Sequence, residues 1–319
     1  MRVFSWLPGS ICSPGRLAPG LLLAAAVFGC DADRALERAP LSSPEASGFV
    51  VDSRDRPLST SAPRARVVSL VPALTDIVLA LGAAHQIVGR TRFDTDVRLE
   101  RVPSVGGTVD ANVEAILDAA PDIVITWADV DVRGLTETLE SFDVSVYAAR
   151  SHSVADFARH TRALGALLGR GAEADSLIRK IDAGLEAVRD PVADSVRPTV
   201  LFVIWPRPLV TTGSGTFVDE LIRLVGARGA FDDLDEPWPT VSIEAVLERD
   251  PDLIVIASED AHGAVPSWIG RHPLWGGLSA VREGRVHLVD GDLFNRPGPR
   301  MDVAAGQLAG FVRALQGHR

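Results

Sequence analysis

One helix-to-strand phrase occurs twice in this chain. Residues 112–127 read NVEAILDAAPDIVITW, and residues 242–257 read SIEAVLERDPDLIVIA. The segments align without a gap; five of sixteen positions are identical, and five more exchange one aliphatic residue for another. The Pro-Asp pair is common connector chemistry, because Pro ends a helix and Asp caps the turn before a strand. The matched phrase as a whole indicates the same unit in each of two lobes.

Short β-branched runs alternate with longer helical stretches on both sides of the chain's middle. Such alternation is typical of an α/β sheet with mostly parallel strands and crossover helices. In the first half, strands are predicted at 66–70, 86–89, 122–126 and 144–149, and helices at 74–82, 113–120 and 134–142. In the second half, strands are predicted at 199–205, 252–257 and 285–289, and helices at 217–226, 243–248 and 301–315.

The middle of the chain, from Ser153 to Arg189, is helical with almost no strand signal. Glycines at 169 and 171 divide it into two helices. The second helix carries an apolar face at helical spacing, made of Ala174, Leu177, Ile181, Leu185 and Val188. We therefore predict an N-terminal α/β lobe at 49–151, a linking helical segment at 152–190, and a C-terminal α/β lobe at 191–319.

The first 29 residues have the pattern of a signal peptide. Leu17 to Gly29 carry no charge, and this run is shorter than the about 20 residues that a transmembrane helix needs. The run ends in VFGC, which resembles a lipobox, so we expect lipidation of Cys30; ordinary secretion with cleavage nearby is the alternative. Residues 30–48 are rich in Pro, Ser and charge and are predicted to be a flexible linker. The sequence thus predicts an exported lipoprotein, in the periplasm or at the cell surface.

Charge and motif content exclude several classes of function. The formal net charge is -10, and Lys180 is the only lysine, which argues against nucleic-acid binding. The histidines have no paired metal-ligand spacing, so no metal site is predicted. The GSG at 213–215 lacks the spacing of a nucleotide fingerprint, and no G-x-S-x-G elbow occurs. We therefore expect the chain to have no enzymatic activity and to need no cofactor.

Four stretches in order resemble one family, the substrate-binding proteins of bacterial ABC importers for cobalamin, ferric siderophores and haem. They are RVVSLVPALTDIVLALGAAHQIVG, SVGGTVDANVEAILDAAPDIVI, TTGSGTFVDELIRLVGARGAF and PWPTVSIEAVLERDPDLIVI. The resemblance covers roughly residues 49 to 315. It implies two Rossmann-like α/β lobes bridged by one long rigid α-helix, with a ligand cleft between them. It also implies a monomer whose partners are a small-molecule ligand and an ABC permease dimer with its ATPase subunits.

Within that family the chain is most similar to the cobalamin-binding type, through PWPTVSIEAVL and GDLFNRPGPR. In that type an Asp and an Arg four residues apart reach the ligand's amide rim, and Asp292 and Arg296 match them. A corrin ring is a flat apolar body fringed with amides, so it needs aromatic walls and a few fixed donors and acceptors. The alternative is a surface ion pair of little energetic value, although Pro297 and Pro299 disfavour a helix that would pair the two residues.

Aromatic residues at predicted strand ends or in loops are candidates for the walls. In doubly wound sheets such ends line the ligand crevice. The candidates are Phe93, Trp127, Trp205 and Trp238, and core packing is the alternative for each tryptophan. One departure is Thr108, where the cobalamin type carries Trp. Binding of a ferric siderophore or haem, or a solute-sensing domain without a transporter, therefore remains as the alternative function.

The glutamate shared by the two phrases is the candidate contact with the transporter. In the family one Glu on each lobe docks into Arg pockets of the permease, and Glu114 and Glu244 match those positions. Two carboxylates on separate lobes make a two-point electrostatic dock that sets orientation and association rate. Helix capping is the other reading, with Asn112 or Ser242 as N-cap and the Glu favoured in the first turn by the helix dipole.

Overall fold

The structure, a computed structural model, describes residues 48–130, 134–190, 197–258, 269 and 274–316. All of them fall within one unit, Ser43–Arg319. The predicted signal peptide, Cys30 and all of the predicted linker except Gly48 lie outside the described residues. Those predictions, like the exact lobe boundaries, stay predictions.

The first lobe is built on a four-stranded parallel sheet in the order β4-β3-β5-β6. Its strands are short apolar runs that are almost wholly buried, as expected of a sheet covered by helices on both faces. The strands are β3 (Val67–Ser69), β4 (Ile87–Gly89), β5 (Ile123–Trp127) and β6 (Ser145–Ala149). The helices are α1 (Pro72–Ala80), α2 (Val113–Asp118) and α3 (Leu135–Glu140), with 3₁₀ turns η2 (Ala84–Gln86) and η3 (Val97–Leu99).

The second lobe has four parallel strands in the equivalent order, β9-β7-β10-β11. In addition, β8 pairs antiparallel with the C-terminal half of β7. The strands are β7 (Thr199–Pro206), β8 (Leu209–Thr211), β9 (Arg228–Gly229), β10 (Leu253–Ser258) and β11 (Val286–Asp290). The helices are α6 (Phe217–Leu224), α7 (Ile243–Arg249), α9 (Ser279–Arg282), α10 (Gly291–Phe294) and α11 (Met301–Gln316), with a 3₁₀ turn η6 (Trp275–Gly277).

The sequence repeat is a structural repeat. Each copy forms a helix followed by the third strand of the parallel order, α2 with β5 and α7 with β10. The side chains of Asn112 and Ser242 cap the two helices by accepting a hydrogen bond from the backbone N–H three residues on. Residues 111–118 and 241–248 also show the same succession of exposed, half-buried and buried positions, with one buried residue per helix, Ile116 or Val246.

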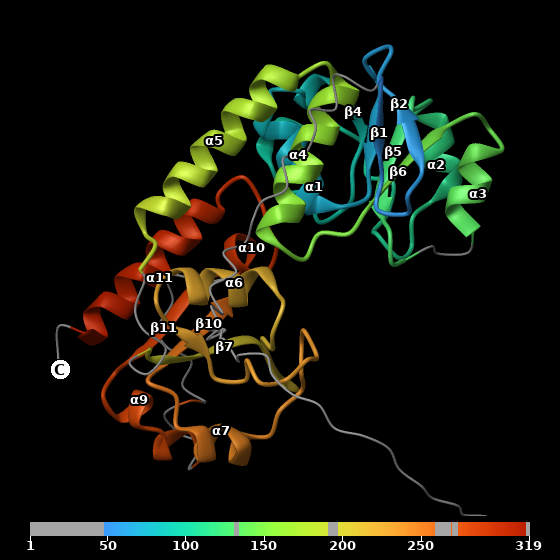
Figure 1. The fold of residues 1–319 in the computed structure, drawn as a ribbon. Helices are drawn as coiled ribbons and strands as arrows, with labels where there is room; N and C mark the ends of the chain where they lie inside the picture. The colour runs from blue at the N-terminus through green and yellow to red at the C-terminus, as the bar shows by residue number, and fades with distance from the viewer. Residues whose placement is uncertain (1–47, 131–133, 191–196, 259–268, 270–273, 317–319) are drawn as a thin grey trace, which may run out of the picture. The chain divides into compact units, whose positions relative to one another are not determined.

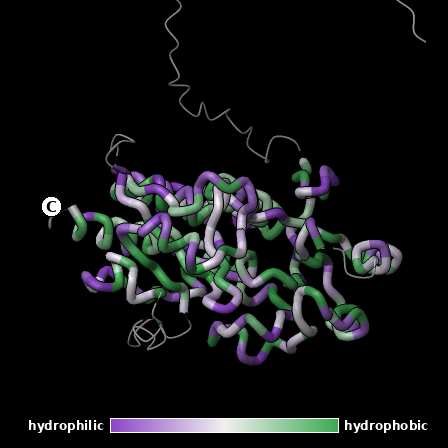
Figure 2. The backbone as a smooth tube through the Cα atoms, turned by 90° about the horizontal axis from the view of Figure 1, so that it is seen from below, coloured by the Kyte–Doolittle hydropathy of each residue, from purple (hydrophilic) through white to green (hydrophobic). Residues whose placement is uncertain are grey.

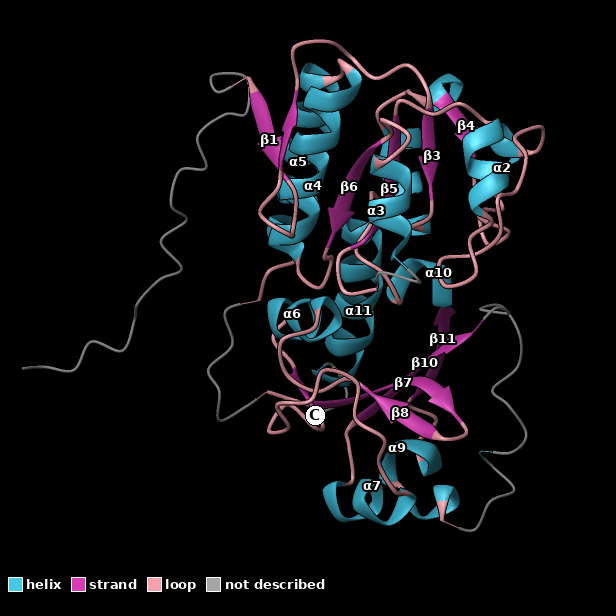
Figure 3. Ribbon diagram, turned by 90° about the vertical axis from the view of Figure 1, so that its right-hand side faces the viewer, coloured by secondary structure: helices cyan, strands magenta, loops and turns pink. Residues whose placement is uncertain are grey.

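Two helices connect the lobes, as the sequence predicted. α4 (Val154–Leu168) ends at Gly169, which adopts a left-handed φ of +69° that favours glycine, and α5 (Gly171–Ala187) follows. α5 packs on α4 toward its start and on α11 of the second lobe toward its end (Figures 1 and 3). Its buried face includes Ile178, while the predicted Leu177 is only half-buried. The prediction of two α/β lobes bridged by a long helix is confirmed.

A β-hairpin precedes the first sheet and was not predicted. β1 (Phe49–Val51) and β2 (Pro57–Ser59) pair antiparallel. β8 and β9 were missed for the same reason, because strands of two or three residues are too short to show a periodicity.

One continuous apolar cluster reaches through both lobes. It contains Val67 and Ile123 of the first sheet, Phe202 and Val255 of the second, and the buried faces of the helices between them. One smaller apolar cluster lies on the opposite face of each sheet. Hydrophobic and hydrophilic stretches accordingly alternate along the backbone (Figure 2). Among the described helices, none has both the length and the apolar character that crossing a membrane requires.

Candidate ligand-binding site

A small pocket forms where the N-terminal half of α1 and the segment around 93–99 meet the residues after α10. Its cavity volume is about 140 Å³. The first lobe contributes Asp76, Phe93, Asp94 and Asp96, and the second lobe contributes Asp292, Arg296 and Arg300. Pockets for whole drug-sized ligands measure about 300–1,000 Å³. This pocket can therefore hold an edge or a substituent of a large ligand rather than the whole of it.

The one-turn helix α10 brings Asp292 and Arg296 together. Asp290 begins this helix by accepting a hydrogen bond from the backbone N–H of Asp292 at 2.9 Å. The helix ends at Phe294, before Pro297, so the prolines do not prevent the pairing that we expected them to disfavour. Arg296 Nη2 lies 2.8 Å from Asp292 Oδ1. The ion pair of the alternative interpretation is thus formed, and it lies at the pocket.

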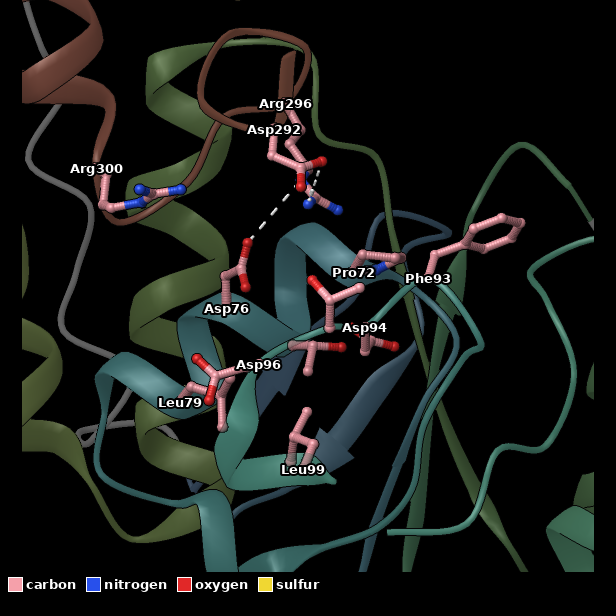
Figure 4. A pocket seen from close by; sticks show the side chains of 12 residues that line it. Pro72, Asp76, Leu79, Phe93, Asp94, Asp96, Leu99, Asp292, Arg296 and Arg300 are labelled. Carbon is pink, nitrogen blue, oxygen red and sulfur yellow. Dashed lines mark ion pairs between the residues drawn. The ribbon is translucent and has the colours of Figure 1, made fainter. Parts of the chain in front are cut away.

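Arg296 also faces a carboxylate of the other lobe. Its Nε lies 3.9 Å from Oδ2 of Asp76 on α1, and the two side chains point toward each other in Figure 4. Burial raises the pKa of Asp76, and the nearby charge of Arg296 opposes this rise. Asp94 and Asp292 raise that pKa further, and Arg300 lowers it. The pocket therefore places one guanidinium between carboxylates from two lobes.

Two more aspartates of the first lobe are held by local hydrogen bonds. Asp94 is buried and accepts hydrogen bonds from the backbone N–H and the hydroxyl of Thr91, at 2.8 and 2.6 Å. Asp96 caps η3, and its hydrogen bond from the Arg98 side chain lowers the pKa of Asp96 to about 2. Four carboxylates thus surround a pocket to which two arginines, 296 and 300, contribute. Such a lining accepts hydrogen bonds from N–H donors and disfavours anionic groups.

Sequence reasoning missed Asp76, Asp94, Asp96 and Arg300. A signal existed for Asp76, because it lies in the helix that directly follows the first predicted strand, and side chains at that junction face the carboxyl edge of the sheet. The other three follow irregular backbone, for which the sequence carries no periodicity.

The predicted aromatic wall is dispersed. Phe93 lines the pocket, but its side chain is 54% exposed, its ring points away from the carboxylates, and the Arg92 guanidinium lies 4.7 Å from the ring centre (Figure 4). Trp205, at the end of β7, is 63% exposed. Trp127, at the end of β5, and Trp238 are half-buried and pack against the large apolar cluster. The structure therefore brings together Phe93, Asp292 and Arg296, and none of the three tryptophans lines this pocket.

Thr108 is the position at which the resemblance led us to look for a tryptophan. Its hydroxyl donates a 2.7 Å hydrogen bond to the carbonyl of Leu70, just beyond the end of β3. The side chain is half-buried, and it secures the loop to the sheet instead of offering an aromatic surface.

Glu114 and Glu244 occupy equivalent, exposed positions in the first turns of α2 and α7. Across the described part of the chain, neither carboxylate forms an ion pair. The side chains of Asn112 and Ser242 accept the N-cap hydrogen bonds, so capping does not require the glutamates.

The only tyrosine is unavailable to an exogenous metal. Tyr147 is fully buried, and its hydroxyl lies 2.7 Å from His160 Nδ1. His160 Nε2 donates to the carbonyl of Arg150 at 2.8 Å, so Nδ1 is the acceptor and the ring is the neutral Nε2–H tautomer. Burial lowers the pKa of His160, which keeps the ring neutral. No three His, Cys, Asp or Glu side chains are placed to hold a metal ion in the portion that the structure describes.

The GSG turn does not present a phosphate cradle. The backbone N–H of Gly213 donates to Pro237, that of Ser214 donates to Leu234, and that of Gly215 donates to the Asp219 carboxylate. These three donors are already used inside the fold.

Comparison with known proteins gives a family and two kinds of neighbour. Residues 67–293 match the family described as periplasmic binding protein. The uncharacterized ABC transporter substrate-binding lipoprotein YvrC of Bacillus subtilis is 26% identical over 302 residues, which cover 91% of this chain and 94% of that protein.

Two solved structures share the fold over most of their length. The periplasmic vitamin B12 binding protein BtuF of Vibrio cholerae is 25% identical, with a TM-score of 0.67, over 80% of this chain and 98% of that one. The periplasmic heme-binding protein BhuT in complex with two hemes is also 25% identical, with a TM-score of 0.69, over 80% of this chain and 99% of that one. Similarity alone therefore does not choose between these ligands.

Proposed function

This chain belongs to the periplasmic binding protein family, and we propose that it captures a corrinoid such as cobalamin and delivers it to an ABC-transporter permease. The observation that carries the choice of ligand is the pocket in which Asp76 of one lobe faces Asp292 and Arg296 of the other. The amides on a corrinoid rim donate N–H groups to carboxylates and offer carbonyls to a guanidinium. Phe93, Trp127, Trp205 and Trp238 are proposed to contact the apolar ring.

Haem is the second candidate ligand, because the heme-binding protein BhuT is as similar in sequence to this chain as the vitamin B12 binding protein BtuF is. Two features weigh against it. The chain's only tyrosine is buried against His160, and no histidine or tyrosine lines the pocket among the described residues. The pocket's four carboxylates also repel the carboxylates of haem, and a ferric siderophore is expected to need more arginines than this lining offers.

The transporter side of the proposal rests on the paired glutamates. Glu114 and Glu244 are exposed and recur in both lobes, so they suit docking of one lobe to each permease subunit. Lipidation of Cys30 is proposed to tether the receptor to the membrane outside the cytoplasm. The receptor acts as a monomer and as a binding protein, not as an enzyme.

A ligand titration tests this function directly. The purified chain is equilibrated with cyanocobalamin, haem or a ferric siderophore, and bound ligand is measured by dialysis and by quenching of tryptophan fluorescence. We expect cyanocobalamin to bind and Asp292→Asn to weaken its binding, since the variant loses the charge that holds Arg296. A chain that takes up the siderophore or haem but leaves cyanocobalamin free contradicts the corrinoid assignment.

A further inference from the structure

The turn of the N-terminal hairpin contacts the end of the strand that carries Trp127. Arg54, between β1 and β2, is half-buried, and its guanidinium donates to three acceptors in the adjacent described segments. Its Nη2 donates to the carbonyl of Trp127 at 3.2 Å, and its Nε donates to the carbonyl of Ala128 at 3.0 Å. Its Nη1 donates to the hydroxyl of Thr136 at 2.9 Å. One side chain thus joins the end of β5 to the first turn of α3.

The hairpin turn is itself fastened to the neighbouring strand of the same sheet. The buried carboxylate of Asp52 accepts hydrogen bonds from the backbone N–H of Arg54 at 2.8 Å and from that of Ala148 at 3.2 Å. The backbone N–H of Ser53 donates to the carbonyl of Ala148 at 2.8 Å. The backbone of Arg54 is therefore linked to β6 through the Asp52 carboxylate, while its side chain holds the end of β5.

The contact lies at the C-terminal end of β5, where the pairing with β6 ends. Trp127 is the last residue of β5, and Ala128 makes one more backbone hydrogen bond, to Ala149. The direction of the Trp127 side chain is then set by its packing against the large apolar cluster and by what fixes its own backbone and that of the next residue. Arg54 fixes both carbonyls at once. A planar guanidinium can satisfy three acceptors in one geometry, which a lysine ammonium on a flexible stem cannot reproduce.

We propose that Arg54 is a positioning residue for ligand recognition, which fixes the end of β5 so that Trp127 stands ready as part of the ligand-binding wall. This inference rests on the proposed function, because it takes Trp127 as a residue that contacts ligand. A half-buried indole that is already oriented loses less conformational freedom on binding than one that must be ordered by the ligand. The alternative role for Arg54 is to stabilise the hairpin without affecting Trp127.

A double-mutant cycle separates these roles. The dissociation constant for cyanocobalamin is measured by equilibrium dialysis, with the full chain in detergent, for wild type, Arg54→Ala, Trp127→Ala and the double variant. We expect Arg54→Ala to raise the constant by about tenfold, within the range for coupled neighbours. The same change in the Trp127→Ala background should have almost no further effect. Equal effects in both backgrounds overturn the inference.

Matched variants guard against a trivial loss of folding. Arg54→Lys keeps the charge and the aliphatic stem, and it should resemble Arg54→Ala in ligand affinity while retaining more stability. Arg189→Ala removes an arginine whose partner is Glu186 at the end of α5, and it should bind ligand like wild type. Full affinity in Arg54→Lys contradicts the need for a three-acceptor fork.

A readout without ligand distinguishes failure of this inference from failure of the proposed function. The emission of Trp127 is obtained by subtracting the spectrum of Trp127→Phe from that of wild type, and the same subtraction is made in the Arg54→Lys background. We expect the Trp127 emission to shift to the red and lose anisotropy in that background. Unchanged emission overturns the inference alone, whereas a wild-type chain that binds no corrinoid, haem or siderophore overturns the proposed ligand role of the site as well.

Discussion

Neighbouring groups act on the pKa of Asp76 in opposite directions. Burial and the neighbouring carboxylates raise its pKa, while the charges of Arg296 and Arg300 lower it, and the net direction is upward. A carboxyl group whose pKa is raised on folding holds its proton in the folded chain at pH values where the unfolded chain has released it. Its ionisation therefore reduces stability as the pH rises above the ordinary value of 3.8 through the folded value.

Asp76→Asn should stabilise the free receptor at neutral pH. The amide cannot ionise, so the variant avoids the unfavourable charge, and its advantage should shrink as the pH falls toward 3.8. Because the Asp76 side chain is 41% exposed, we expect the gain in unfolding free energy to stay below about 1 kcal/mol. Urea unfolding at pH 5 and pH 8 measures it, with Asp175→Asn, an exposed carboxylate on α5, as the matched control. A loss of stability at pH 8 means that attraction to Arg296 outweighs burial.

At the scale of the elements, α5 and α11 approach each other closely at Gly184. A Cβ added to Gly184 would lie 2.6 Å from the Cβ of Asp302, closer than real side chains allow. The absence of a side chain at this position lets the linking helix rest directly on the last helix of the second lobe. The lobes are thus joined through backbone proximity as well as through apolar burial.

Gly184→Ala should separate this pair of helices and lower the unfolding free energy by about 1–3 kcal/mol, the usual range for overpacking. Gly306→Ala is the matched control, since it lies in α11, is exposed, and has open space around its Cβ position. That control should gain about 0.5–1 kcal/mol, because alanine is the better helix former. Denaturant unfolding of both variants tests the contact, and similar gains in both contradict a close approach at Gly184.

The elements that could be predicted from the sequence are those with a repeated or periodic pattern. The phrase around Glu114 and its copy around Glu244 predicted α2, β5, α7 and β10, because the helices carry apolar positions at helical spacing and the strands are continuous apolar runs after a Pro-Asp pair. The hairpin β1–β2 was not predicted, because its strands are too short to show a periodicity and Asp52 and Ser53 hold it to a strand that is distant in sequence. Such contacts leave no local pattern.

At the scale of the whole molecule, contacts between residues distant in sequence also limited what could be predicted of the site. Asp292 and Arg296 could be found because they are close in sequence, and resemblance pointed to them. Asp76 could not be joined to them, because the 3.9 Å approach to Arg296 exists only after α5 and the shared apolar cluster have brought the two lobes together. A second polar link, from the backbone N–H of Val154 to the Glu220 carboxylate at 2.8 Å, depends on the same assembly.

Docking through Glu114 and Glu244 involves the whole receptor, because the two glutamates lie on different lobes. If Glu114 and Glu244 dock with two permease subunits, the double variant Glu114→Lys/Glu244→Lys should bind ligand with unchanged affinity and lower uptake by cells at least about tenfold, as expected when like charges oppose a docking surface. The loss of two acidic residues from helix first turns should cost about 0.3–1 kcal/mol each.

The control for this variant must change the same charge in the same kind of place. Glu137→Lys/Glu173→Lys does so, because both residues are exposed and lie in the first turns of α3 and α5. It should lose at least as much stability, because Glu173 also pairs with Arg170 at 3.1 Å, and it should retain uptake. Uptake is measured with radiolabelled ligand in cells that express the cognate permease, and ligand affinity is measured on the purified chains. If the two double variants lose uptake equally, net charge rather than a two-point dock governs delivery.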